Sequence, residues 1–109
     1  MKRWKTIYRG DKLLGYAGLE DGLGPCCPFE AAEGFFEIEH LFKEEDRLFE
    51  EWAALDKRNN AKEEMELVAK IDAVMAEILA PGVRMYEKDD NIGFECIDLT
   101  IANGRVCWR

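Results

Sequence analysis

The first long stretch with a regular hydrophobic pattern lies between residues 33 and 57. Apolar side chains recur there every three or four positions, which predicts a helix with one stripe facing a core. Glu45 interrupts that stripe. The stripe consists of Ile38, Leu41, Phe42, Leu48, Phe49, Trp52 and Leu55.

A second helical pattern follows the polar residues 56–60. Asn60, with Glu63 three positions later, resembles a capping box that opens a helix, and Pro81-Gly82 should end it. The two helices are therefore predicted to form an antiparallel hairpin. The second apolar face consists of Met65, Val68, Ile71, Val74, Met75, Ile78 and Leu79.

Short aromatic and β-branched segments before the helices predict strands. Residues 4–9 and 13–17 flank Gly10-Asp11, which suits a two-residue II′ turn, so a β-hairpin is expected. The Gly- and Pro-rich segment 18–28, which contains Cys26-Cys27, predicts a loop.

Further strands are predicted after the helices, at residues 83–86 and 94–101, with a polar turn at 88–91. Asn103-Gly104 is the strongest turn signal in the chain. As a type I′ turn it places Leu99 opposite Trp108 and Thr100 opposite Cys107. Alternation then predicts one face with Ile97, Leu99, Ile101, Val106 and Trp108, and another with Cys96, Asp98, Thr100, Cys107 and Arg109.

The order of elements is therefore ββ-αα-βββ, which predicts a single α+β domain over residues 1–109. We expect a mostly antiparallel sheet with a long αα-hairpin packed on one face, because each layer needs the other to hide its apolar side. The second face of the sheet would stay uncovered, which leaves a homodimer through that face as an alternative.

Charge is distributed unevenly along the chain. The sequence has 15 basic and 23 acidic residues, a formal net charge of -8. Basic residues concentrate in the first 19 positions and acidic residues in positions 30–70. The two segments either attract each other within the molecule or bind different partners. The basic start also contains aromatic residues, but the overall negative charge argues against a nucleic-acid partner.

The chain lacks an apolar stretch near the ~20 residues that span a bilayer, and its N-terminus is polar. We therefore expect a cytoplasmic protein without membrane contact, whose four cysteines are reduced thiols.

The positions of the potential ligands along the chain argue against a metal site. A zinc site would need Cys26 or Cys27 with Cys96, Cys107 and His40. Cys107 faces Thr100 in the predicted register, so Cys96 lies roughly 13 Å along the strand, which also argues against a Cys96–Cys107 disulfide. Glu37-x-x-His40 is a single copy of a motif that di-iron bundles need twice. We predict no metal and no cofactor.

Serine is absent from the sequence, so Ser-His-Asp catalysis is excluded. The acidic helices instead predict a non-enzymatic interaction module of inhibitor, immunity or adaptor type that binds a basic protein surface. The alternative is a small enzyme or ligand-binding protein that uses Cys26 or Cys27, with His40 as the base. The predicted partner-binding residues are Glu37, Glu44, Glu45, Asp46, Glu50, Glu51, Glu63 and Glu64, with Glu66 nearby.

Overall fold

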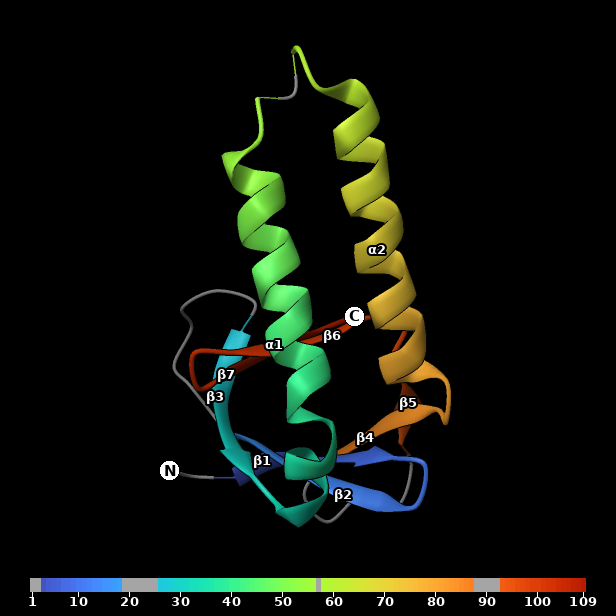
Figure 1. Ribbon diagram of the computed structural model, residues 1–109. Coiled ribbons are helices and arrows are strands. Elements are labelled where there is room, and N and C mark those ends of the chain that lie inside the picture. The colour runs from blue at the N-terminus through green and yellow to red at the C-terminus, as the bar shows by residue number, and fades with distance from the viewer. Residues whose placement is uncertain (1–2, 19–25, 57, 88–92) are drawn as a thin grey trace.

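The computed structural model describes residues 3–18, 26–56, 58–87 and 93–109 and has an α+β architecture (Figure 1). The described elements are β1 Arg3–Arg9, β2 Lys12–Gly18, β3 Cys26–Ala31, α1 Glu33–Ala54, α2 Ala61–Leu79, β4 Val83–Glu87, β5 Phe94–Glu95, β6 Leu99–Ala102 and β7 Arg105–Trp108. In this part of the chain the strands form one antiparallel sheet in the order β5-β4-β1-β2-β3-β7-β6. Neither of these helices is long and apolar enough to cross a bilayer.

The two tight hairpins match their turn signals. Gly10, the first central residue of the β1–β2 turn, has a φ of 61°, as a II′ turn requires. Asn103 and Gly104 both have positive φ, and the predicted register of β6 and β7 is confirmed, with Leu99 opposite Trp108.

The predicted loop at residues 18–28 is wrong at its C-terminal end. Cys26, Cys27 and Pro28 belong to β3, which lies between β2 and β7. Phe29 donates its N–H to the Gly104 carbonyl, so the strand continues past Pro28 although proline has no N–H. The rest of that loop, residues 19–25, and the whole predicted turn at 88–91 lie outside the described residues.

A disulfide corrects the expectation that every thiol is reduced. Cys107 has Thr100 as its neighbour on β6 and Cys26 as its neighbour on β3. The Cα atoms of Cys26 and Cys107 are 4.5 Å apart and the two residues are disulfide-bonded. Cys27 and Cys96 are buried thiols outside this bond.

The sheet is curled because the strands at its two edges are nearly consecutive in sequence. In a flat sheet the six spacings between β5 and β6 would separate them by about 29 Å. The four peptide steps from Glu95 to Leu99 reach at most about 14 Å. The connecting segment contacts both edges, since Cys96 N–H donates to the Val83 carbonyl and Ile97 N–H to the Arg109 carbonyl.

This connection breaks the predicted alternation over residues 94–101. Cys96 is buried, whereas Ile97 is 76% exposed. Both residues lie between β5 and β6 rather than inside one continuous strand, so the expectation of a core position for Ile97 and a polar-face position for Cys96 is wrong.

The core joins the strands to the sheet-proximal parts of the helices. Ile38, Leu41 and Phe42 of α1 and Ile78 of α2 lie in one cluster with apolar residues of the strands. The outer parts of the helices run side by side away from the sheet (Figure 1). A hairpin packed along its length on one face of the sheet is therefore not confirmed.

The ends of α2 show how local chemistry sets its limits. The helix begins after Asn60 as predicted, but Asn60 makes no side-chain cap; its amide instead donates to the Asp56 carbonyl. At the other end, Arg9 donates from Nε to the Ile78 carbonyl at 2.8 Å and from Nη2 to the Glu77 carbonyl at 2.9 Å. A cation at the C-terminus of a helix also opposes the negative end of its dipole.

We expect Arg9→Met to lower the free energy of unfolding by about 1 to 3 kcal/mol, because two helix-end carbonyls lose a charged donor. Urea denaturation measures the change. The control is Arg109→Met, which removes an exposed arginine side chain. Equal losses in the two variants would show that Arg9 does not stabilise the end of α2.

Replacing both Cys26 and Cys107 with Ser is expected to cost about 2 to 4 kcal/mol of stability, because the bond closes a loop with a sequence separation of 81. A thermal melt with and without dithiothreitol checks this. The reductant should lower the midpoint of the original chain and leave that of the double variant unchanged. A midpoint insensitive to the reductant in both proteins would contradict the prediction.

Candidate functional site

The predicted acidic residues of α1 are partly neutralised by the protein itself. Glu37 forms an ion pair with Lys12 of β2. Arg47 pairs with both Glu44 and Glu51, and its hydrogen bond holds the pKa of Glu44 below its ordinary value. These side chains are about half exposed, and such pairs contribute little to stability, so they can exchange for other partners.

The outer part of the hairpin, residues 49–70, is called the arm here. No described residue of the arm is buried. Phe49, Met65 and Val68 are 41%, 74% and 40% exposed, respectively. Helices gain most of their stability from packing an apolar face, so this part of the hairpin leaves apolar surface open to a second molecule.

A groove of about 300 Å³ lies between the helices in the arm. Leu55 and Leu67 supply its apolar surface, and Lys70 is the basic lining residue. Three carboxylates line the groove: Glu51 of α1 and Glu63 and Glu66 of α2. We call this feature the arm groove. It brings together Glu51 and Glu63 from the predicted set with the nearby Glu66.

Glu45 is not part of any acidic surface, because it is fully buried. Neither carboxylate oxygen has a hydrogen bond of ordinary geometry to a described residue. Burial raises the pKa of Glu45 to about 7; Thr100 lies near enough to lower it through its hydroxyl, while Asp98 and Asp46 raise it further. Glu45 was predicted as a partner-binding residue, and its burial excludes direct contact with a partner.

The remaining predicted residues lie at separate places. Asp46 is half-buried and lines a pocket at the base of α1. Glu50 is exposed on α1, and Glu64 is half-buried on α2. The predicted set is therefore divided among the surface of α1, the buried position of Glu45, the arm groove and the position of Glu64 on α2.

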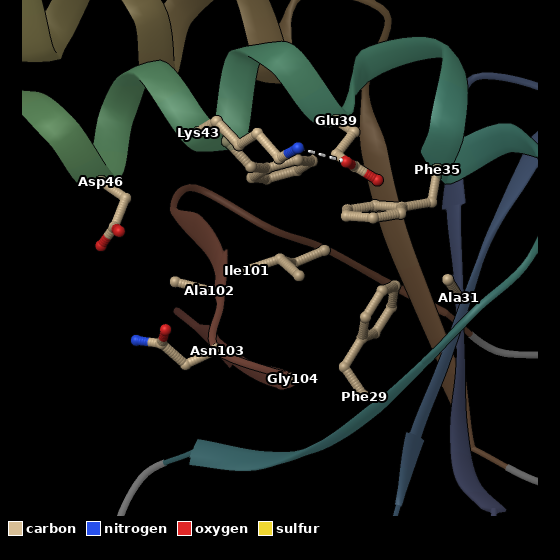
Figure 2. A pocket seen from close by; sticks show the side chains of 11 residues that line it. Phe29, Ala31, Phe35, Glu39, Lys43, Asp46, Ile101, Ala102, Asn103 and Gly104 are labelled. Carbon is tan, nitrogen blue, oxygen red and sulfur yellow. Dashed lines mark ion pairs between the residues drawn. The ribbon is translucent and has the colours of Figure 1, made fainter.

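The pocket at the base of α1, called the base pocket below, has a volume of about 390 Å³. Its walls are mainly apolar: Phe29 of β3 and Phe35 of α1 meet edge to face at 5.2 Å between ring centroids, and Phe42 stacks on Phe35. Ile101 of β6 also lines it. Figure 2 shows the Phe35 ring below α1 and the Phe29 ring pointing up toward it from β3.

Polar groups surround the opening of the base pocket. Glu39 and Lys43 form an ion pair of 2.7 Å along α1. In Figure 2, Asp46 of α1 and Asn103 of the β6–β7 turn lie at one end of the pocket, across Ile101 and Ala102 from the rings of Phe29 and Phe35. Asp46 has no ion pair within the described parts of the chain.

Close packing between β2 and β3 positions one wall of this pocket. A Cβ atom on Gly15 would lie 2.7 Å from the Phe29 ring and 2.3 Å from the Glu30 carbonyl oxygen. Glycine therefore lets β3 approach β2 closely enough for Phe29 to reach Phe35.

Sequence patterns missed this pocket. Phe29 follows a segment predicted as a loop, and Phe35 lies outside the predicted apolar stripe of the helix. The available signal was a pair of adjacent aromatics, Phe35-Phe36, just before the predicted stripe. Phe36 is 65% exposed, whereas Phe35 packs against the core.

The described basic residues of the N-terminal segment form contacts within the protein. Arg3 pairs with Glu30, and Lys5, almost fully buried, pairs with Glu87 at 3.1 Å. Arg9 and Lys12 contact the helices as described above. These contacts support the alternative in which the basic N-terminal segment attracts acidic groups of the same molecule.

The residues of the alternative cysteine chemistry are not assembled into a site. Cys26 is disulfide-bonded and Cys27 is buried. Burial raises the pKa of Cys96 to about 11, which disfavours its reactive thiolate. His40 is exposed on α1. Among the described residues, no group of three or more potential ligands is placed to hold a metal.

We expect Glu45→Gln to stabilise the protein above neutral pH. The pKa of Glu45 is 4.5 in the unfolded chain and about 7 in the folded state. The stabilising contribution of the protonated side chain is therefore complete below pH 4.5 and is lost as the pH rises through 7. At pH 8 the variant should gain up to about 3 kcal/mol, and near pH 4.5 the difference should vanish. Urea denaturation at several pH values measures it.

The control is Glu44→Gln on the same helical turn. The pKa of Glu44 is lowered by Arg47, so its own contribution is lost as the pH falls, the opposite direction. If the free energy of unfolding of Glu45→Gln changed with pH in parallel with that of the original chain from pH 4.5 to 8, the Glu45 carboxylate would be hydrated or paired, contrary to the prediction.

Comparisons with known proteins give no relative from which to transfer a function. No protein family model, curated protein sequence or solved structure shows significant similarity to this chain.

Proposed function

We propose that this chain is a non-enzymatic interaction module whose helical arm binds a basic protein. The observation that carries the proposal is the arm groove, where Glu51, Glu63 and Glu66 surround Leu55 and Leu67. A lysine or arginine side chain has the complementary form, because its aliphatic stem packs on apolar surface while its charged end meets carboxylates.

Exposed apolar residues near the groove support a protein partner over an isolated cation. Phe49, Met65 and Val68 contribute apolar surface on the same arm. Protein interfaces combine apolar contacts with a charged rim, and complementary charge accelerates encounter. The partner is therefore a folded protein with a Lys- or Arg-rich patch that also offers apolar side chains.

Internal ion pairs do not block this role. Arg47 holds Glu51 through one exposed pair, and Lys70 lines the same groove. Exposed pairs of this kind contribute little to stability, so a partner's cation can replace them. In this proposal the base of the hairpin packs on the curled sheet and holds the arm away from it.

Cellular location is a separate matter. A cytoplasmic location stays a prediction, and the Cys26–Cys107 disulfide is typical of oxidising compartments. The proposed contact uses neither cysteine and holds in either environment.

We expect the immobilised protein to retain a basic partner from lysate at low salt and to release it at about 0.5 M salt, where screening is strong. Neutralising the groove with Glu63→Gln and Glu66→Gln should reduce retention of that partner severalfold. The amount of the partner bound is quantified by mass spectrometry, and its affinity is then measured with the purified protein.

A control variant with the same net charge is Asp72→Asn combined with Glu33→Gln, two exposed carboxylates outside the arm groove. It should retain the partner as well as the original chain does. The proposal fails if no protein is retained at low salt, or if the two variants lose the partner equally.

A further inference from the structure

We propose that the base pocket is a binding site for a small organic amine with an aromatic or branched aliphatic body. This site is separate from the arm groove and does not depend on the proposed partner. The pocket's volume of about 390 Å³ lies within the range of small-molecule sites.

The apolar part of the ligand is specified by the walls. Phe42 and Ile101 are buried, and Phe29 and Phe35 are half-buried, so the two outer rings have apolar surface that a ligand can cover. Aromatic rings favour edge-to-face or offset contacts, which the Phe29–Phe35 pair already makes at 5.2 Å. One further ring or a branched alkyl group fits this environment.

The charge of the ligand is specified by the opening. Glu39 and Lys43 neutralise each other through their ion pair. Asp46 is the charged lining residue that no described ion pair balances, and it lies with Asn103 at one end of the pocket (Figure 2). A protonated amine can donate to the Asp46 carboxylate while its body extends over Ile101 toward the rings.

An anionic ligand is the competing case, because Lys43 also lines the pocket. The Lys43 side chain is 75% exposed and engaged with Glu39, whereas Asp46 is half-buried. The less exposed charge is screened less by solvent, so it should decide the preference.

Three probes with one phenyl body test the proposal on the full chain: phenethylamine, 2-phenylethanol and 3-phenylpropionate. We expect phenethylamine to bind tightest, with a dissociation constant on the order of 1 mM, as its size allows. In NMR titrations the amide signals of Phe35, Ile101 and Gly104 should shift.

Two variants test the two parts of the site. Asp46→Asn should weaken phenethylamine about threefold to fivefold, to the level of 2-phenylethanol, and leave 2-phenylethanol unchanged. Ala31→Leu adds bulk at an exposed lining position and should weaken all three probes. The control is Glu50→Gln, which removes the same charge one helical turn away from Asp46, at a residue that does not line the pocket.

The proposal is overturned if no probe shifts the pocket signals at 20 mM, if 3-phenylpropionate binds more tightly than phenethylamine, or if Glu50→Gln weakens phenethylamine as much as Asp46→Asn does. None of these results bears on retention of a basic protein by the arm groove, so failure of this site and failure of the proposed function are distinguishable.

Discussion

The short connection between β5 and β6 is the constraint on which the rest of the structure depends. It joins opposite edges of the sheet through residues 96–98, and a chain of that length cannot cross a flat sheet of this width. The sheet must curl, which brings β6 and the β6–β7 turn to the side of α1. Contacts between α1 and β6 then create both the burial of Glu45 and one wall of the base pocket.

The same arrangement determines which charged side chains contact the helices. Arg9 lies at the end of β1, where it meets the C-terminal turn of α2 and satisfies two carbonyls. Lys12 begins β2 and pairs with Glu37 on α1. The basic N-terminal segment thus secures the sheet-proximal ends of both helices, and most of the arm's carboxylates lie beyond its contacts. What stays available to another molecule is therefore the outer hairpin, which combines open apolar surface with Glu63 and Glu66.

Local sequence patterns predicted the helices and tight turns well. They did not predict which strands pair when those strands lie far apart in the sequence. Helical periodicity located α1 and α2, and Asn103-Gly104 determined the register of β6 against β7. The Cys26–Cys107 bond could not be predicted in this way, because the sequence shows only one neighbour of β7 and the other lies far away in the chain. For the candidate site, the sequence indicated that the two helices carry many carboxylates, but not that Glu51 and Glu63 share a groove. The base pocket was not predicted, since Phe29 of β3 and Ile101 of β6 come together through the pairing of β3 with β7, which is distant in the sequence.

Glu45 and Asp46 show why sequence pattern alone misassigns an acidic helix. They are consecutive, so a turn of about 100° along the helix separates their side chains. One lies buried near Thr100 and the other at the opening of the base pocket. A residue with the size of leucine would fill the position of Glu45 without an ionisable group, so the glutamate is a cost to stability above neutral pH. Because α1 and β6 form both environments, ionisation of Glu45 weakens the same helix–strand contact that holds Ile101 against the pocket. The stability of the fold and the shape of the pocket are consequently linked through one contact.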